Sequence, residues 1–293
     1  MRILFQISFV SIFLLPFIAI SQKYTCGIIL DSLSLKPVSY ATVSTLSTSM
    51  YCDSLGYFKL NKSQDDYLII SCIGYNTKRV SIDNDKCDTI LLSQAFKELD
   101  PVTVRKPDFL NNKKIQLGKL EGKSKFSINV PSGLTILKYF PMPEQSKAYI
   151  IGELKIRASH SPEDYEPRKV RVRIFEANAG NVLGRDILQS SDIFIIDNIE
   201  NQIATLDLSG YGIKIPKKGC FVGIEFIRNG FEKDLKSKEY KGWLAIKGWL
   251  ANSFEDGVVL RRYFNNEFTE FSFGSQQKSN IYAALTVFEV SEN

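Results

Sequence analysis

Several residue types that enzyme and metal sites depend on are scarce in this 293-residue sequence. It has one histidine, His160, and three methionines. A single histidine excludes metal sites built from several histidines, and no G-x-S-x-G motif supplies a serine nucleophile to pair with it. No C-x-x-C motif occurs, so neither a redox pair nor a structural zinc site is indicated. No stretch repeats apolar residues at i, i+3, i+4 and i+7, which predicts little helix.

Long apolar runs are also missing after the first residues. Arg2 is followed by a run from Ile3 to Ile20 that Ile, Leu, Phe and Val dominate, and then by Ser21. This pattern predicts a signal peptide over residues 1–21. The alternative is an uncleaved anchor, since about 18 apolar residues nearly span a bilayer, but Gln6 and Pro16 weaken it. We expect an exported protein, in the periplasm, on the outer-membrane surface or outside the cell, with no transmembrane segment after cleavage.

Charge and composition narrow the class further. The formal net charge of +5 is carried by scattered lysines and arginines, with no basic stripe on a helix, so no nucleic-acid partner is expected. The length and the 44% hydrophobic content suit two domains with real cores. Twenty Phe and thirteen Tyr favour sheets.

Short β-branched and apolar runs separated by turn residues predict seven strands in the first part of the chain. Asp53 to Gly56 forms a tight turn in this reading, and Ala41 and Val43 are the expected buried residues opposite Phe58 and Leu60. A seven-stranded sandwich is the economical closure. The predicted strands cover residues 24–31, 38–46, 49–52, 56–61, 67–73, 77–82 and 88–93, with a further extended piece at 101–104.

This part of the sequence contains, in order, the short motifs G-x-I-x-D, K-P-V-x-Y-A-T-V, D-S-x-G-Y-F-x-L, I-x-S-x-I-G-Y and L-x-P-V-x-V. These motifs and their order resemble those of the carboxypeptidase-regulatory-like domain. The resemblance covers Tyr24 to about Val104 and implies a transthyretin-like β-sandwich of the type found in exported Bacteroidota proteins. In that family the module is non-catalytic, so a structural or docking role is implied for a domain over residues 22–104. No catalytic residues are carried over.

Four cysteines, Cys26, Cys52, Cys72 and Cys87, fall in this first domain. An oxidising exterior allows up to two disulfides among them in any of three pairings. The alternative is that they are small buried hydrophobic residues. Cys220 lies in an apolar strand and is expected to be a lone core thiol.

Residues 105–125 carry seven Lys or Arg and little periodicity, which predicts an exposed linker. Residues 126–293 then predict a jelly-roll-like sandwich, and part of this region resembles an uncharacterised sandwich domain that follows the regulatory-like module in exported proteins. In V-R-V-R-I-F-E-A, Val170, Val172 and Ile174 share a dry face, while Arg171, Arg173 and Phe175 share a wet one. C-F-V-G-I-E-F-I should be a central strand. The clearest predicted strands are 150–158, 169–177, 193–196, 203–208, 220–228, 242–250, 258–264 and 281–290.

The most distinctive stretch is K-G-W-L-A-I-K-G-W-L-A-N. Trp243 and Trp249 share a face of one strand, and with Tyr240 and Tyr263 they could form an aromatic platform for sugar rings, to which Arg171 and Arg173 would add hydrogen bonds. The alternative is that both tryptophans lie in the core.

Acidic residues cluster in three loops. The first holds Glu163, Asp164 and Glu166, the second Asp197 and Glu200, and the third Glu255 and Asp256. Calcium binding and glycoside hydrolysis are the alternatives, and the prediction is that these carboxylates are solvated charges. We therefore expect an all-β, non-enzymatic protein without metal or cofactor, which binds a glycan or an envelope protein. A structural or assembly module that pairs its edge strands with another envelope protein is the alternative, and a carboxylate-dependent glycosidase is the remaining one.

Overall fold

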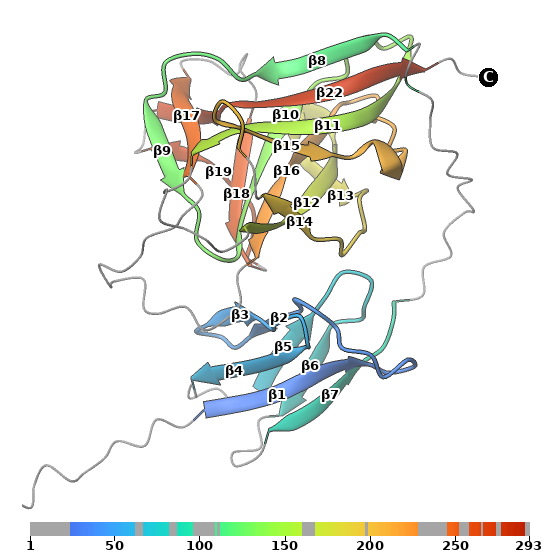
Figure 1. The fold of residues 1–293 in the computed structure, drawn as a ribbon, viewed down its shortest axis with the longest axis vertical. Helices are drawn as coiled ribbons and strands as arrows, with labels where there is room; N and C mark the ends of the chain where they lie inside the picture. The colour runs from blue at the N-terminus through green and yellow to red at the C-terminus, as the bar shows by residue number, and fades with distance from the viewer. Residues whose placement is uncertain are drawn as a thin grey trace, which may run out of the picture.

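The fold is all-β, as predicted. The structure, a computed structural model, describes residues 24–61, 67–81, 87–95, 109, 112–159, 168–196, 199–227, 245–251, 258–264, 266–273 and 277–290. Within these ranges the only helical segments are two short 3-10 turns, Ala179–Asn181 and Ser209–Tyr211. No described helix is long and apolar enough to cross a membrane. Strands form an N-terminal and a C-terminal domain (Figure 1).

The N-terminal domain has the seven predicted strands. A three-stranded sheet, in the order β4-β1-β7, faces a four-stranded sheet in the order β3-β2-β5-β6. β1 pairs with β4 antiparallel and with β7 parallel. The strands are β1 (Tyr24–Asp31), β2 (Thr42–Ser44), β3 (Ser49–Tyr51), β4 (Tyr57–Asn61), β5 (Tyr67–Ser71), β6 (Lys78–Ser81) and β7 (Asp88–Leu92).

The core of this domain contains the residues that alternation predicted. Ala41 and Val43 are buried together with Phe58 and Leu60. Gly56 has φ +76° in the turn before β4, where a Cβ atom would meet the Ile29 carbonyl, so the turn requires a glycine. The predicted extended piece at 101–104 lies outside the described residues.

One disulfide joins Cys26 to Cys87. The parallel pairing of Gly27 with Asp88 places Cys87, just before β7, next to Cys26 in β1. Cys52, Cys72 and Cys220 are free thiols. Cys220 is fully buried in the core of the C-terminal domain, as predicted.

The C-terminal domain is a larger sandwich of two antiparallel sheets. The first, here called the β16 sheet, has the order β13-β12-β16-β10-β18-β19, with β14 also paired to β12. The second, the β11 sheet, has the order β20-β21-β17-β11-β22-β8, with β15 on β11 and β9 on β17. The strands are β8 (Lys114–Lys119), β9 (Phe126–Asn129), β10 (Leu134–Phe140), β11 (Ala148–Ser159), β12 (Arg168–Ala177), β13 (Leu183–Asp186), β14 (Phe194–Ile196), β15 (Ile203–Asp207), β16 (Cys220–Ile227), β17 (Ala245–Ala251), β18 (Val259–Tyr263), β19 (Thr269–Glu270), β20 (Ser272–Phe273), β21 (Gln277–Ile281) and β22 (Ala283–Val290).

Period-two alternation fills the space between these sheets. Val170, Val172 and Ile174 of β12 lie in the core cluster, as the sequence predicted. β16 is buried along its whole length and lies between β12 and β10, which confirms it as a central strand.

Residues 105–125 need a correction, because the predicted exposed linker contains β8. This strand pairs with β22 at the edge of the β11 sheet, and Ile115 and Leu117 pack against the core. The lysines that flank them are exposed, and their number in the sequence concealed the alternation.

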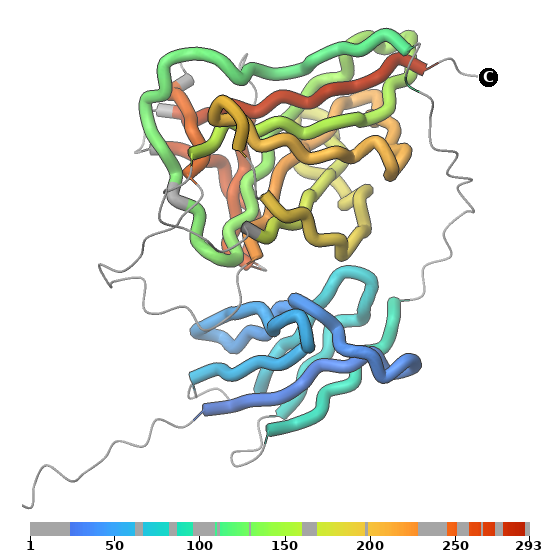
Figure 2. Tube along the Cα trace, in the orientation of Figure 1, coloured from blue at the N-terminus to red at the C-terminus, as the bar shows by residue number. Residues whose placement is uncertain are grey.

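The two domains are in contact. The N-terminal domain lies below the C-terminal domain in Figures 1 and 2, with β2 and β3 on the side that faces it. A small apolar cluster spans this junction, and β16 contributes Ile227 to it. Its other members are Tyr40, Tyr51, Ile193 and Phe264.

Candidate functional site at the domain junction

A row of polar residues crosses the outer face of the β16 sheet. Arg171 of β12 lies opposite Glu225 of β16, Glu225 opposite Thr135 of β10, and Thr135 opposite Arg262 of β18. On β12, β10 and β16 the neighbours along the strand lie in the core, so these paired side chains share the outer face. This face is covered: Arg171 is 4% exposed and Glu225 5% exposed.

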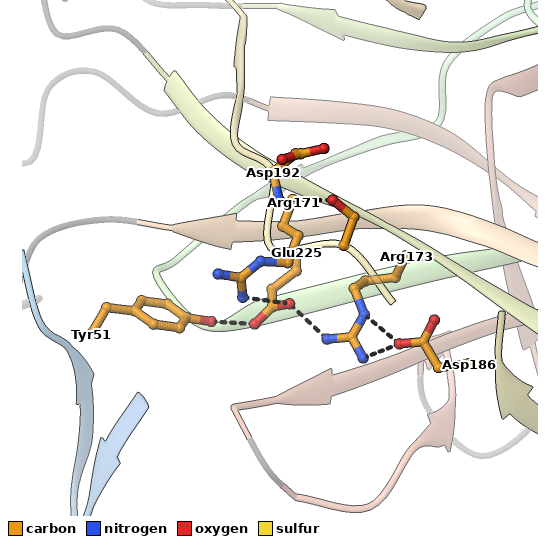
Figure 3. A network of polar contacts seen from close by, with 7 residues as sticks. Tyr51, Arg171, Arg173, Asp186, Asp192 and Glu225 are labelled. Carbon is orange, nitrogen blue, oxygen red and sulfur yellow. Dashed lines mark hydrogen bonds and ion pairs between the residues drawn. The ribbon is translucent and has the colours of Figure 1, made fainter. Parts of the chain in front are cut away.

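Tyr51 connects the two domains through this row. Its hydroxyl group donates a hydrogen bond to Oε1 of Glu225 at 2.7 Å (Figure 3), and the tyrosine is fully buried. The ring also contacts Phe264 of the C-terminal domain, with centroids 5.2 Å apart. The contact therefore combines a hydrogen bond to a buried carboxylate with apolar packing around it.

The second carboxylate oxygen of Glu225 is held by arginines. Oε2 accepts a hydrogen bond from Nη1 of Arg173 at 2.9 Å, and Nη1 of Arg171 lies 3.5 Å away. Arg173 continues the network, because its Nε and Nη2 both donate to Oδ2 of Asp186 on β13 (Figure 3). Gly223, opposite Arg173 on β16, has no side chain on this face.

These contacts fix the charge states. Burial alone would raise the pKa of Glu225, but the charges of Arg171 and Arg173 and the hydrogen bond from Tyr51 bring it below its ordinary value of 4.5. Burial, and next to it the charge of Glu225, raises the pKa of Tyr51 well above 10.0. A carboxylate held ionised and a phenol held protonated are what a structural ion network requires. They do not form an acid–base pair poised near neutral pH.

Arg171 and Arg173 were predicted on a wet face, and this prediction was wrong. They do share one side of β12 with Phe175, but all three are buried. The alternation of charged and apolar residues resembles a solvated strand. Here Tyr51 of the other domain and the carboxylates of Glu225 and Asp186 take the place of water.

The aromatic platform is not assembled among the described residues. Trp249 lies on β17 in the β11 sheet, where its ring packs 4.5 Å from that of Tyr282, with Nζ of Lys138 4.8 Å from its centroid. Tyr263 lies on β18 in the other sheet. Trp243 and Tyr240 lie outside the described residues, so their part of the prediction stays a prediction.

The sequence analysis missed Glu225 and Tyr51. A usable signal was present, because Glu225 is the single charged residue of C-F-V-G-I-E-F-I. A carboxylate in a fully buried strand needs a cationic partner, and R-x-R in a neighbouring strand provides two. Tyr51 carried no comparable signal, since nothing local distinguishes it from other aromatic strand residues.

The predicted loop carboxylates remain mostly unplaced. Glu200 lies in a described turn, whereas His160, Glu163, Asp164, Glu166, Asp197, Glu255 and Asp256 lie outside the described residues. Among the residues that are described, no group of three or more His, Cys, Asp or Glu could hold a metal ion.

Comparison with known proteins identifies the N-terminal domain, about a quarter of the sequence. Residues 25–104 match the family model of the CarboxypepD_reg-like domain, which confirms the predicted regulatory-like domain. Further β-sheet follows it in the chain. A search of the curated proteins found no match.

Proposed function

We propose that this CarboxypepD_reg-like domain binds a protein partner, as part of an exported, non-enzymatic envelope or surface protein. The observation that carries the proposal is a set of three exposed leucines on hydrogen-bonded turns of the N-terminal domain. Leu33, Leu35 and Leu55 are 70%, 62% and 65% exposed, and together they are called the leucine surface. Exposed large apolar side chains that are held in place suit a protein contact.

Asp31 holds the first of these turns. Its Oδ1 accepts hydrogen bonds from the amides of Leu33 and Ser34 and from the Ser34 hydroxyl, and its Oδ2 accepts one from Gln94. These bonds, led by that from the Ser34 amide, lower the pKa of Asp31 far below its ordinary value. Leu35 has φ +54°, a conformation that is unfavourable for leucine. The turn after β1, at the right of the lower domain in Figure 1, therefore presents its leucines in a fixed form.

Leu55 lies in the neighbouring turn. Oδ1 of Asp53 accepts hydrogen bonds from the amides of Leu55 and Tyr57. The Ser39 hydroxyl, four residues after Leu35, donates to the Ser54 carbonyl at 2.7 Å, which links the segment that follows the first turn to the second turn. A surface that is ordered before binding loses less conformational entropy when it is covered.

Two further features support the setting. The signal-peptide pattern of residues 1–21 favours export, and a disulfide between Cys26 and Cys87 suits an oxidising compartment. The sequence motifs of the regulatory-like domain and the β-sheets that follow it suit an exported protein of the Bacteroidota type, with a second sandwich domain. The domain junction would present the leucine surface in a constant orientation relative to the C-terminal domain.

Glycan binding is less well supported. The ring of Trp249 is occupied by Tyr282 and by two lysines, Lys119 and Lys138. Tyr263 belongs to the opposite sheet. A glycan-binding platform on the C-terminal domain would have to use residues other than Trp249 and Tyr263.

The test is affinity purification from an envelope extract with the mature protein as bait. Leu33→Ser, Leu35→Ser and Leu55→Ser, combined in one variant, should weaken retention of a stoichiometric partner by at least about tenfold, because burying one leucine is worth about 1.5–3 kcal/mol and 1.4 kcal/mol is tenfold.

The matched control is Val182→Ser with Ile195→Ser, two apolar residues of the C-terminal domain with 59% and 53% exposure. This control should keep the partner. Retention by the triple variant would refute the leucine surface, and sugar affinity that Trp249→Ala abolishes would favour glycan binding instead.

A further inference from the structure

Arg171 and Arg173, the two arginines of β12 in this network, differ in their hydrogen bonds. Arg173 uses its Nε and Nη2, the side of the guanidinium group that offers two parallel donors, to bind Asp186. In Arg171 the same two nitrogens are buried and have no hydrogen-bond partner in the described structure. Its remaining contact is Nη1 with Glu225 at 3.5 Å, and that carboxylate is already bound more closely by Arg173 and Tyr51.

Unpaired donors recur along the same row. The Oγ1 atom of Thr135 and Nε of Arg262 are likewise buried without a partner among the described residues. Buried polar groups in native proteins are almost always satisfied, by protein, water or an ion. All of these atoms can donate a hydrogen bond, and they outnumber the one acceptor of the network that is also buried without a partner, Oδ1 of Asp186. What is missing beside the row is therefore mainly an acceptor.

The described part of the junction also has an excess of positive charge. Three guanidinium groups, of Arg171, Arg173 and Arg262, face two carboxylates, of Glu225 and Asp186. Tyr51 adds no negative charge, since its phenol is held protonated. On the N-terminal domain's side, burial raises the pKa of Cys72, although the charge of Arg171 acts in the opposite direction, so this thiol is neutral as well. Water would satisfy the donors, but only an anion would also balance the charge.

We propose that a small oxyanion, carboxylate-like or phosphate-like, binds the Nε–Nη2 edge of Arg171 at the junction of the two domains. Two parallel N–H donors match two oxygens of a carboxylate or phosphate group. On the neighbouring Arg173 the same edge already holds a carboxylate, with both nitrogens donating to one oxygen of Asp186. Because Arg171 is 4% exposed, the anion is enclosed when the domains come together, and it favours the joined state. The site is independent of the leucine surface, which lies on other turns of the N-terminal domain.

Thermal unfolding of the mature protein tests the proposal. Sodium phosphate or sodium acetate replaces sodium chloride at constant ionic strength. The midpoint should rise with the concentration of one of the two oxyanions, and at ten times the dissociation constant the ratio of folded to unfolded protein increases about 11-fold. The phosphate and acetate arms show which oxyanion class the site prefers. Crystals grown with selenate, a phosphate-shaped probe, should show anomalous density at the Arg171 edge.

Two variants separate the site from general salt effects. Arg171→Lys keeps the charge but removes the paired donors, so the concentration-dependent shift should disappear. Arg185→Lys, at a largely exposed arginine bound to Glu176, should keep the shift. The proposal is overturned if the shift is equal in wild type and Arg171→Lys, or if crystals grown with the oxyanion that raises the midpoint show only water at this edge. Because the crystallographic test uses the wild-type protein, it stands even if Arg171→Lys does not fold.

Discussion

Removal of the Tyr51 hydroxyl tests whether the domain junction contributes to stability. In Tyr51→Phe the ring and its contact with Phe264 remain, but Oε1 of Glu225 loses a donor at 2.7 Å. Hydrogen bonds to charged groups contribute about 1.5–3 kcal/mol, and a buried acceptor left without its donor adds to the loss. We expect Tyr51→Phe to lower the free energy of unfolding by about 2 kcal/mol, or about 5 °C in the unfolding midpoint.

A double-mutant cycle with Glu225→Gln isolates the pair. Glu225→Gln alone should cost about 3–5 kcal/mol, because it leaves Arg171 and Arg173 buried without their shared carboxylate. In that background Tyr51 donates to a neutral amide, so Tyr51→Phe should cost only about 1 kcal/mol. The expected coupling energy is then about 1 kcal/mol. Urea denaturation of the mature protein, followed by tyrosine fluorescence and circular dichroism, measures each corner.

The control is Tyr263→Phe, at a tyrosine of the same sheet that is 42% exposed. It should change the free energy of unfolding by less than about 0.5 kcal/mol. If Tyr51→Phe behaves like this control, the hydroxyl is solvated and the domains are not joined through Glu225. A coupling energy indistinguishable from zero would refute the pairing even if both single variants were destabilised.

Three further outcomes follow from the structure. The folded-state pKa of Glu225 is depressed below 4.5. The ionised carboxylate therefore contributes fully to the free energy of unfolding above pH 4.5, and this contribution is lost as the pH falls through the folded-state pKa. The difference in the free energy of unfolding between wild type and Glu225→Gln should narrow only below about pH 4.5. Non-reducing peptide mapping should find Cys26 bound to Cys87, and replacing both by serine should cost about 4 kcal/mol for a sequence separation of 61; another pairing would refute the strand register. A Cβ at Gly223 would collide with the Ile136 backbone, so Gly223→Ala should cost about 3 kcal/mol in the same urea assay, whereas unchanged stability would contradict the close approach of β16 and β10.

The N-terminal domain could be predicted almost strand by strand, because its signals are local. Gly56 and Asp53 mark a turn whose geometry depends on these residues themselves. The alternation of Ala41 and Val43 with polar neighbours selects the face that packs in the domain's own core, although Thr42 and Ser44 on the other face are buried as well. The strand boundaries differ from the predicted ones where the strand in the structure is shorter, as in β2.

The candidate site could be predicted only in part, because its environment comes from distant segments. R-V-R-I-F correctly predicts a strand with the arginines on one face, but whether that face meets water depends on β3, 120 residues earlier in the chain. The surroundings of Trp249 also come from distant segments. Its neighbours Tyr282 and Lys138 come from other strands, and no local pattern distinguishes a packed tryptophan from an exposed one.

The junction network has a consequence for how the two domains can be arranged. A buried ion network contributes little net stability, because desolvation offsets most of the attraction, yet losing any one partner leaves a charge buried and unpaired. An alternative docking of the N-terminal domain on the β16 sheet would leave Glu225 without its Tyr51 donor while Arg171 and Arg173 stayed covered. An apolar junction built from Tyr40, Ile227 and Phe264 alone would tolerate sliding far better. The polar row therefore selects one orientation of the domains, and the apolar cluster provides most of the attraction.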